Sequence, residues 1–392
     1  MTITTAPQTG IPVLHLVHNS VYLDPAIFAA EQERIFGKVW NFVCHESEIA
    51  RPGDYITRDV AGCPMIITRD KTGRLHAFYN TCPHRGSLVA LQPRGNCKAF
   101  LCPYHNWTFS LDGRLTGVPG LESFAGTGFR KEDFGLHEAR IDSLHGLVFV
   151  CQSDDTPSLA DYIGPEMAAW LYKPLGLAEF ELIEYRTIEV RANWKLNAEN
   201  ARDGYHVPNL HPFLRKASRR APYHIYEPHA LQEMNVNDKA LSPELWRSMN
   251  ENALPGMNPH GGYVAVLFPD TFLKVMSDHV AIHSQIALAP DRIITEDRVL
   301  GLKGDPEEVK ECRRKSWRPW LGDRVEFEDL PQFERVQRGI TNRHVPIGII
   351  PRQGEAFGNS NQGDDERIRV FWKYWREMMG LRQNAAPTVQ LI

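Results

Sequence analysis

The pattern of apolar and polar positions divides the chain of 392 residues into three parts. Residues 21–40 follow a helical period, and Asp24 followed by Pro25 is typical of the start of a helix. From about residue 40 to residue 151, short apolar runs alternate with turns that contain Gly or Pro, which predicts a domain of short strands. After residue 157 the pattern changes again, to longer alternating runs mixed with helical stretches.

The third part predicts long strands together with helices. Its last predicted helix begins with acidic residues and ends at a glycine, as the dipole and the C-cap of a helix favour. The aromatic residues of this helix fit core packing better than a cofactor site: Phe371, Trp372, Tyr374 and Trp375. The predicted strands are residues 185–190, 263–268, 271–276, 279–289 and 293–302, and the predicted helices are residues 193–206, 305–318 and 364–380.

Composition narrows the class of protein without identifying it. Charged residues make up 23% and hydrophobic residues 42%, and the net charge is 44 − 48 = −4, so no global basic surface for nucleic acid is expected. No apolar run approaches the length of a membrane span, and the first 19 residues lack the pattern of a secretory signal. We therefore expect a cytoplasmic protein in which five scattered cysteines are free thiols: Cys44, Cys63, Cys97, Cys151 and Cys312.

Two pairs of metal-ligand residues lie in the all-β part. They are Cys82-Pro-His84 and Cys102-Pro-Tyr-His105, and each pair offers one thiolate and one imidazole. Two Cys and two His are the ligands of a Rieske [2Fe–2S] centre, in which two histidines replace two cysteines on one iron. Structural zinc also accepts this set, but zinc modules usually pair Cys with Cys and His with His. The mixed pairs therefore favour the two-iron cluster, with zinc as the alternative.

A second candidate metal site surrounds His206 and His211. Asp203 and His206 share a face of a helix, whereas His206 and His211 are separated by about 140° around an ideal helix. Pro208 disfavours a regular helix and lets the chain turn so that both rings point to one site. Two imidazoles completed by one carboxylate form the facial triad of non-haem Fe(II) oxygenases. On its own this motif is weak evidence for a metal site. The one-electron centre predicted upstream strengthens it, because the electrons of that centre need a terminal acceptor.

With both motifs, the chain resembles the α subunits of Rieske non-haem iron oxygenases, a family that includes the aromatic-ring-hydroxylating dioxygenases. The resemblance rests on residues 82–86, 102–109 and 193–211, and it extends to residues 40–43, 52–55 and 328–339. It therefore covers about residues 20 to 380. Asn106 stands where many members carry Gly or Ala, a departure beside a cluster ligand that removes no ligand.

The resemblance implies a role for each residue of the two motifs. Cys82 and Cys102 would bind one iron of the cluster, and His84 and His105 would bind the other. His206, His211 and Asp329 would bind the mononuclear iron. Glu326 and Glu328 are alternatives to Asp329, and Asp323 is a weaker one.

Asp203 and Asn200 would support the mononuclear iron without binding it tightly. The resemblance implies that Asp203 connects His206 to the cluster ligand His105 of a neighbouring subunit, which gives electrons a short path between the metals. A carboxylate behind a metal-bound histidine is a common arrangement. Asn200 would lie next to the iron, and the alternative for it is a helix-capping or solvent-exposed residue.

The resemblance also implies the fold. We expect an α+β chain, with an N-terminal helical segment of the catalytic domain at residues 1–39 and an all-β Rieske domain at residues 40–155. Residues 156–392 would form the catalytic domain, a curved antiparallel sheet covered by helices in the manner of a helix-grip fold.

The implied function is that of the terminal oxygenase component in the breakdown of aromatic compounds. It would take electrons from NADH or NADPH through a reductase or ferredoxin, and use O₂ to cis-dihydroxylate or hydroxylate a small carboxylated aromatic. A homotrimer, with or without a β subunit, is implied. The alternatives are a Rieske monooxygenase or demethylase acting on N-methyl or O-methyl groups, and a Rieske electron carrier without oxygenase activity.

Substrate contacts are the least defined part of the sequence. Residues 215–220 form a basic run, which is a solvated face, an attractor of anionic substrate or a docking site for an acidic electron donor. Several residues near the ligands and on the predicted sheet are candidates for the pocket, although each fits an ordinary core position better: Val207, Leu210, Phe213, Leu214, Phe268, Met276, His283 and Phe327.

Overall fold

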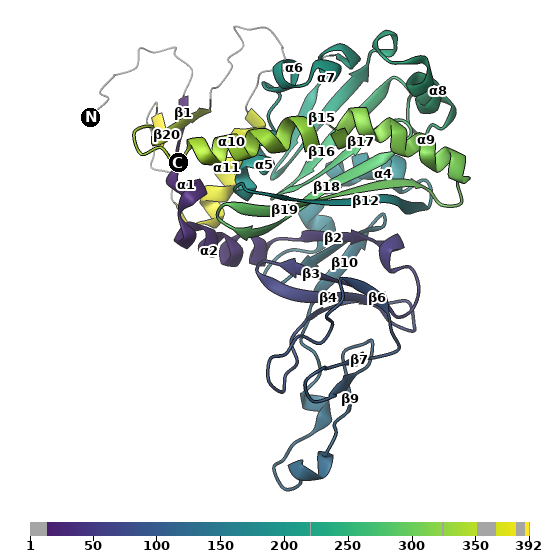
Figure 1. Cartoon of the computed structure of the whole chain (residues 1–392), viewed down its shortest axis with the longest axis vertical. Helices are drawn as coiled ribbons and strands as arrows, with labels where there is room; N and C mark the ends of the chain where they lie inside the picture. The colour runs from purple at the N-terminus through teal and green to yellow at the C-terminus, as the bar shows by residue number, and fades with distance from the viewer. Residues whose placement is uncertain (1–13, 220, 324, 351–365, 382–388, 392) are drawn as a thin grey trace. The chain divides into compact units, whose positions relative to one another are not determined.

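The computed structural model describes residues 14–219, 221–323, 325–350, 366–381 and 389–391. The chain forms two compact units (Figure 1). The smaller unit holds residues 36–163 and 180–182, and the larger unit holds the chain up to residue 35, residues 164–179 and the chain from residue 183 onward. The domain limits expected from the sequence, at residues 39/40 and 155/156, stay predictions.

The smaller unit is an all-β structure, as predicted. Short apolar runs become its central strands, and every residue of the run from Leu147 to Cys151 is buried. A separate three-stranded sheet joins β7 (Phe100–Leu101), β8 (Thr108–Phe109) and β9 (Leu115–Gly117). The main sheet has seven antiparallel strands in the order β2 (Asn41–His45), β11 (Leu147–Cys151), β10 (Glu138–Leu144), β5 (Leu75–Tyr79), β4 (Cys63–Arg69), β3 (Asp54–Val60) and β6 (Arg94–Asn96).

The larger unit is built on an eight-stranded sheet. The expected strands at residues 263–302 are present with ends that shift by one or two positions, because alternation of apolar residues is strong there. The pairs from β19 to β13 are antiparallel, and β14 (Tyr223–Tyr226) also pairs with β15. The order is β12 (Phe180–Val190), β19 (Arg292–Leu302), β18 (Val280–Ala289), β17 (Thr271–Val275), β16 (Gly261–Leu267), β15 (His229–Val236) and β13 (Ser218–Arg219).

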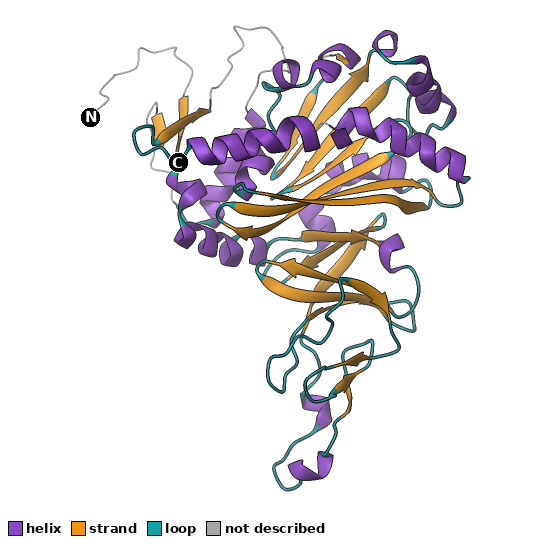
Figure 2. Cartoon of the chain, in the orientation of Figure 1, coloured by secondary structure: helices purple, strands orange, loops and turns teal. Residues whose placement is uncertain are grey.

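Helices cover this sheet, which confirms the expected α+β architecture. In Figures 1 and 2, α9 (Glu307–Trp317) and α10 (Leu330–Gly339) run across the strands. Three of the four aromatic residues of α11 (Glu366–Met378) are core residues as interpreted, since Phe371, Trp372 and Trp375 are at most 1% exposed, whereas Tyr374 is only partly buried. Other helices of this unit are α4 (Pro165–Leu175), α5 (Trp194–Asn200), α6 (Val207–Leu210), α7 (Pro212–Ala217) and α8 (Pro243–Glu251).

Two predicted helices are shorter than expected. The lead-in at residues 21–40 is divided into α1 (Ser20–Leu23) and α2 (Pro25–Arg34), because the Asp24 side chain accepts a hydrogen bond from the Ala26 amide and starts a new helix. The helix expected at residues 193–206 ends at Asn200. Its continuation is irregular, and this irregular segment leads to the candidate metal site.

The described residues also form a small three-stranded sheet. β1 (Leu14–His18) lies between β20 (Ile347–Ile350) and β21 (Val389–Leu391). All seven cysteines lie in the described ranges, and none of them forms a disulfide. Among the described residues, no helix combines the length and the apolar character that crossing a membrane requires.

Candidate metal centres and substrate pocket

The two Cys/His motifs fold into matching turns in the smaller unit. In the first turn the Gly86 amide donates to the Cys82 carbonyl at 2.9 Å, and in the second the Asn106 amide donates to the Cys102 carbonyl at 2.9 Å. Gly86 and Asn106 both have a positive φ, of 73° and 57°. Asparagine is one of the few residues other than glycine that tolerates this conformation. The departure at Asn106 is therefore compatible with the turn.

The four cluster candidates come together as two pairs. Cys82 and Cys102 are buried, at 2% and 1% exposed. Burial and the neighbouring Cys102 thiol raise the pKa of Cys82. His84 and His105 are partly exposed, and their ring centres lie 4.6 Å apart. An inner pair of sulfurs and an outer pair of imidazoles fits a two-iron cluster with sulfur ligands on one iron and nitrogen ligands on the other.

An aromatic side chain fixes one of these imidazoles. Trp107 stacks on His84 with ring centres 4.9 Å apart and planes inclined by 6°. Burial lowers the pKa of His84, and the adjacent His105 lowers it further. A lowered pKa favours the neutral imidazole, which is the form that binds a metal.

In the larger unit, His206 and His211 stand at the two ends of one short helix. His206 immediately precedes α6 (Val207–Leu210) and His211 immediately follows it. Pro208 lies in the first turn of α6, where proline is favoured because its missing N–H would be unpaired there in any case. The expected interruption of the helix is therefore present, and it lets two histidines five positions apart approach one point.

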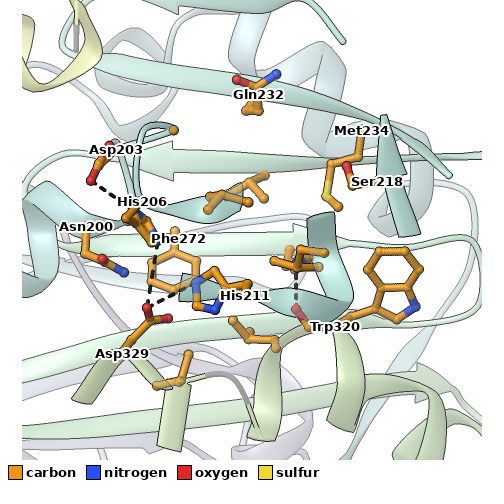
Figure 3. A pocket seen from close by; sticks show the side chains of 18 of the residues that line it. Asn200, Asp203, His206, His211, Ser218, Gln232, Met234, Phe272, Trp320 and Asp329 are labelled. Carbon is orange, nitrogen blue, oxygen red and sulfur yellow. Dashed lines mark hydrogen bonds and ion pairs between the residues drawn. The ribbon is translucent and has the colours of Figure 1, made fainter. Parts of the chain in front are cut away.

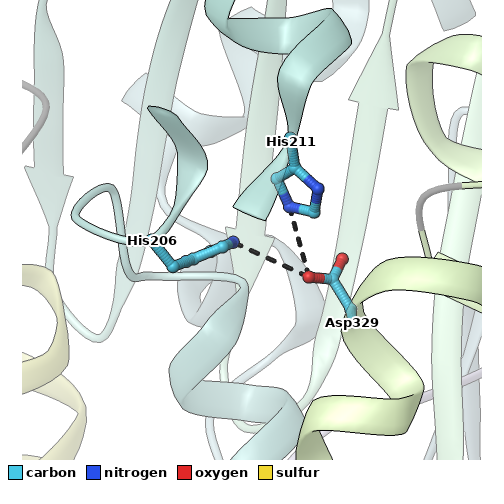
Figure 4. A group of neighbouring side chains, drawn as sticks. All are labelled: His206, His211 and Asp329. Atoms are coloured by element: carbon cyan, nitrogen blue, oxygen red, sulfur yellow. Dashed lines mark ion pairs between the residues drawn. The ribbon is translucent and has the colours of Figure 1, made fainter. Parts of the chain in front are cut away.

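His206, His211 and Asp329 converge on that point (Figure 4). One donor atom from each residue lies within 4.8 Å of the others. Asp329 Oδ1 is 3.2 Å from His211 Nε2 and 3.8 Å from His206 Nε2. Asp329 ends the helical turn η7 (Val325–Asp329), which is far from the histidines in sequence.

The donor set fits a resident metal ion. Asp329 is 6% exposed and His211 is 2% exposed. Among the described residues, the buried Oδ1 atom of Asp329 has no partner in hydrogen-bond geometry, although it lies 3.2 Å from His211 Nε2. A buried carboxylate oxygen without a partner costs free energy, and a cation would offset that cost. Two imidazole nitrogens and one carboxylate, with room for other ligands, are the set that suits non-haem Fe(II).

Each histidine has a carboxylate behind it. The Nδ1 atom of His206 lies 2.9 Å from Asp203 Oδ2, and the Nδ1 atom of His211 lies 2.5 Å from Glu328 Oε2. These contacts leave the two Nε2 atoms directed at Asp329, the arrangement common behind metal-bound histidines. Glu328 therefore faces the far side of His211. Glu326 instead forms an ion pair with Arg186 at 2.6 Å, so the geometry favours Asp329 over both alternatives.

Asp203 is held as an anion beside this site. Burial alone would raise its pKa, but the hydrogen bond with His206 and the amides of Tyr205 and His206 outweigh burial and lower the pKa. Asn200, at the end of α5, lines the same cavity as Asp203 and His206 (Figure 3).

Comparison with known proteins shows which family the chain belongs to. Residues 39–130 match the Rieske [2Fe-2S] domain, and residues 177–381 match the catalytic domain of the ring hydroxylating alpha subunit. The chain belongs to the Rieske ring-hydroxylating oxygenases. It is an oxidoreductase whose cofactors are a Rieske [2Fe–2S] cluster and a mononuclear iron, and it is the terminal oxygenase component that receives electrons from NAD(P)H through a reductase.

Curated relatives of the oxygenase cover almost the whole chain. The 2-aminobenzenesulfonate 2,3-dioxygenase subunit alpha of Alcaligenes sp is 32% identical over 96% of this chain and 97% of its own length. The terephthalate 1,2-dioxygenase terminal oxygenase component subunit alpha 2 of Comamonas sp is 31% identical over 93% and 95%. The anthranilate 1,2-dioxygenase large subunit of Burkholderia cepacia is 29% identical over 92% of each chain.

Two solved structures have the same fold as this chain. Naphthalene 1,2-dioxygenase from Rhodococcus sp. superposes with a TM-score of 0.78 at 23% identity, over 93% of this chain and 94% of that chain. The quaternary ammonium Rieske monooxygenase CntA superposes with a TM-score of 0.78 at 24% identity, over 93% and 95%. These two likenesses therefore establish the architecture of the oxygenase and not its substrate.

A cavity of about 160 Å³ adjoins the metal-binding residues of the oxygenase. Figure 3 shows Asn200, His206, His211 and Asp329 together in one part of the cavity, with Trp320 away from them. The apolar lining consists of Ala201, Val207, Leu214, Ala221, Met234, Val264, Phe272, Trp320, Leu321, Val325 and Phe333. Asp203, Gln232, Lys274 and Arg219 are among the polar residues that line it.

The sequence identified only part of this lining. Of the candidates, Val207 and Leu214 line the cavity, whereas Phe327 is 67% exposed. The other candidates are absent from the described lining: Leu210, Phe213, Phe268, Met276 and His283. In the basic run, Arg215, Lys216 and Arg219 are exposed and residue 220 lies outside the described residues.

Several lining residues that the sequence analysis did not name lie two positions apart on strands of the central sheet. Gln232 and Met234 alternate on β15, and Phe272 and Lys274 alternate on β17, so each pair faces one side of the sheet. The signal that could have found them was Lys274, the one charged residue of a strand in which every position is buried.

Glu328 offers a test of the carboxylate behind His211. We expect Glu328→Gln to weaken iron binding by about 10- to 100-fold, because loss of the negative charge makes His211 a poorer ligand. Competition with a chelator, followed by iron analysis, measures the change. Glu251→Gln, at an exposed position of α8, is the control and should leave the affinity for iron unchanged. Equal affinity of the Glu328 variant and the wild type would contradict the role.

Glu199, a partly buried acid near the site, was given no role from the sequence. The Glu199 carboxylate accepts hydrogen bonds from the Tyr22 hydroxyl at 2.8 Å and the Trp372 indole at 2.6 Å. Burial raises the pKa of Glu199 to about 7, although Tyr22, Trp372 and Lys195 each favour the anion. Glu199 is therefore largely protonated in the folded state at mildly acidic pH.

This pKa predicts how stability depends on pH. Between pH 4.5 and about 7 the folded chain holds a proton on Glu199 that the unfolded chain releases, so stability falls as pH rises. The full shift corresponds to roughly 3 kcal/mol at about 1.4 kcal/mol per pKa unit. Glu199→Gln can accept the same two hydrogen bonds and should remove this loss. Thermal unfolding between pH 5 and 8 measures it, with exposed Glu308→Gln as control. Parallel pH profiles for wild type and Glu199→Gln would show the prediction to be wrong.

Proposed function

We propose that the oxygenase hydroxylates a small aromatic acid with one ring, most simply by cis-dihydroxylation. The observation that carries this proposal is the cavity of about 160 Å³ bordered by His206, His211 and Asp329. A cavity of roughly 150 Å³ accommodates benzene. A substituted benzene ring therefore matches the space next to the proposed iron ligands.

The relatives support the acidic substrate. The three full-length relatives are named for 2-aminobenzenesulfonate, terephthalate and anthranilate, which are all single-ring aromatic acids. The relatives named for naphthalene, a neutral hydrocarbon with two rings, align with only 52% of this chain. An anthranilate 1,2-dioxygenase large subunit from Acinetobacter baylyi aligns over the same 52%, so the aligned share does not separate the two kinds of substrate. The size of the cavity supports a single ring, and the names of the three full-length relatives support an anionic group.

The side chains have distinct tasks in this proposal. The mononuclear iron, when bound, supplies O₂ activation, and the [2Fe–2S] cluster supplies electrons one at a time. His206, His211 and Asp329 hold the iron, while Asp203 and Glu328 accept from the Nδ1 atoms and keep Nε2 available. The apolar wall formed by residues such as Val207, Phe272 and Leu321 excludes water and orients the ring. Asn200 is proposed to help position groups next to the iron.

The cluster side of the proposal uses Cys82, His84, Cys102 and His105. We propose a homotrimer in which Asp203 of one subunit bridges His206 to His105 of a neighbouring subunit. The ionised state of Asp203 supports this role, since a carboxylate can accept from an imidazole on each side. The names of the relatives as alpha or large subunits are consistent with an additional β subunit. The cytoplasm, where free thiols persist, is the proposed location.

Product analysis tests the proposal. The purified oxygenase, a partner reductase and NADH are supplied with a panel of single-ring aromatic acids under ¹⁸O₂. We expect substrate-dependent consumption of NADH and O₂, and a ring cis-diol that carries two labelled oxygens. Formaldehyde released from an N-methyl or O-methyl substrate, without a ring diol, would support a demethylase instead. Electron uptake without oxygenation of any member of the panel would favour an electron carrier.

A further inference from the structure

One amide on the wall of the substrate cavity is held by two neighbouring side chains. Asn197 lies on α5, three residues before Asn200, so the two residues share a face of this helix. Both line the cavity, yet Asn197 is only 4% exposed. Its Nδ2 atom lies 3.0 Å from His283 Nε2 and 3.0 Å from Gln285 Oε1. One end of the amide is therefore fixed, which leaves the other end for the cavity.

The orientation of this amide follows from a chain of hydrogen bonds. Gln285 Nε2 donates to the carbonyl of Trp194 at 3.0 Å, and a carbonyl can only accept, so Oε1 is the end of Gln285 that faces Asn197. The atom of Asn197 that meets Oε1 must then be a donor, which makes it Nδ2. The same atom meets His283 Nε2, so this ring nitrogen accepts and the ring proton lies on Nδ1. The Nδ1 atom accordingly donates to the Asp297 carboxylate at 2.6 Å.

Asp297 anchors the far end of this chain. Arg186 contacts its Oδ2 atom through Nε at 3.2 Å and through Nη2 at 2.6 Å. Burial alone would raise the pKa of Asp297, but His283 and Arg186 outweigh burial and lower the pKa, so the ionised carboxylate keeps accepting from His283. The His283 ring also stacks on Phe272, a residue of the cavity lining, with ring centres 4.6 Å apart. One histidine therefore supports both an aromatic surface of the cavity and the amide of Asn197.

The oxygen end of Asn197 is left as a hydrogen-bond acceptor. Among the described residues Oδ1 has no hydrogen-bond partner, and it is not one of the unpaired polar atoms that the protein encloses completely. It therefore borders the open space that Asn197 lines, which is the substrate cavity. A fixed acceptor that is almost surrounded by protein favours a ligand that brings a donor to it.

The other polar groups of the lining differ from this amide. Asn200 and Ser218 can each turn a donor or an acceptor toward a ligand. Gln232 is the closest equivalent, because its Nε2 atom donates to backbone carbonyls and leaves Oε1 as an acceptor, but it is only partly buried and Figure 3 shows it away from Asn200. The carboxylates of the lining each contact an imidazole, and its cations cannot accept a hydrogen bond: Asp203, Glu233 and Asp329 are the former, and Arg219, Lys274 and Arg367 the latter.

We propose that Asn197 Oδ1 accepts a hydrogen bond from an amino or hydroxyl substituent on the substrate ring and so selects aromatic acids that carry such a group. His283 holds Phe272 and Asn197 together, so a ring that packs on Phe272 can present this substituent to the amide. A methyl group in the same place would leave the acceptor buried without a partner, which costs more free energy than one hydrogen bond contributes. This inference rests on the proposed function, since it adds a second recognised group to the aromatic acid.

Binding to the holoenzyme tests the assignment separately from turnover. The probes are the aminobenzoates and hydroxybenzoates, each matched with the toluate that carries a methyl group at the same ring position. The members of a pair share the carboxylate and differ in whether the second substituent can donate. Calorimetry under argon measures each affinity. We expect the wild type to prefer the donor in at least one pair by about 5- to 100-fold, and Asn197→Ala to reduce that preference below about 3-fold.

Three further variants keep the experiment decisive. Asn197→Asp retains an oxygen acceptor and should retain the preference, as should Gln232→Leu, which removes the competing amide. Asn250→Ala, at an exposed position of α8, should bind every probe as the wild type does. The assignment is wrong if the wild type binds no donor better than its toluate, if Asn197→Ala weakens both members of a pair equally, or if Asn197→Asp or Gln232→Leu loses the preference. A preserved preference without hydroxylation of any probe would overturn the proposed function and leave the assignment standing.

Discussion

Asp329→Asn should abolish hydroxylation while leaving the [2Fe–2S] cluster intact. The carboxylate is the only anionic member of the trio with His206 and His211, and an amide oxygen is a much weaker ligand for Fe(II). Replacing even the outer partners of metal ligands costs about 10- to 100-fold in metal affinity or activity, so loss of a direct ligand should exceed 100-fold. Product formation per chain and iron content per chain are the two measurements.

The matched control for this change is Asp323→Asn. Asp323 precedes the same helical turn and is outside the trio of converging donors, so the control should keep both iron and activity. The visible spectrum and the reduction of the cluster by the reductase should be unchanged in both variants. Full activity of Asp329→Asn would show that Asp329 is not an iron ligand, and Glu328 would then be the leading alternative.

Asp203→Asn should separate reduction of the cluster from use of its electron. Asparagine can still accept from His206 Nδ1, so the iron should remain bound, but the negative charge that completes the proposed bridge is lost. We expect turnover to fall by about 10- to 100-fold, in line with other carboxylates behind metal-bound histidines. Stopped-flow absorbance should show that the reductase reduces the cluster at the normal rate. Reoxidation of the cluster in the presence of substrate and O₂ should become slow.

Asp238→Asn, at a partly exposed position of the same unit outside the cavity lining, is a suitable control for the general effect of removing a charge. Its rates of cluster reduction and reoxidation should match those of the wild type. If Asp203→Asn reoxidised its cluster at the wild-type rate with substrate and O₂ present, electrons would have to reach the iron by a path that does not include Asp203.

Local patterns predicted the strands and turns well. The strands at residues 263–302 are long and alternate strongly, and the structure has them with small shifts at their ends. The interruption of the helix near Pro208 was also predictable, because proline restricts the residue before it and favours the first turn of a new helix. The start of α2 at Pro25 was recognisable in the same way, but not that the preceding residues would form a separate short helix.

Features that depend on packing between distant segments were less predictable. Asp329 is more than a hundred residues from the histidines, and spacing alone could not separate it from Glu326 and Glu328. The structure distinguishes them by direction, since Glu328 contacts His211 Nδ1 and Glu326 contacts Arg186. Lys274 was missed for a similar reason. The face of β17 that meets the cavity depends on where the covering helices lie, and the strand itself does not contain that information.

Single turnover is the most direct test of the central claim that this chain is an aromatic-ring oxygenase with iron held by His206, His211 and Asp329. The holoenzyme is reduced chemically, freed of reductant and reductase, and mixed with a single-ring aromatic acid and ¹⁸O₂. We expect labelled hydroxylated product in an amount close to the number of mononuclear iron sites, with reoxidation of the cluster in the wild type and no product from His211→Ala. Cluster reoxidation without labelled product, or equal product from wild type and His211→Ala, would contradict the account.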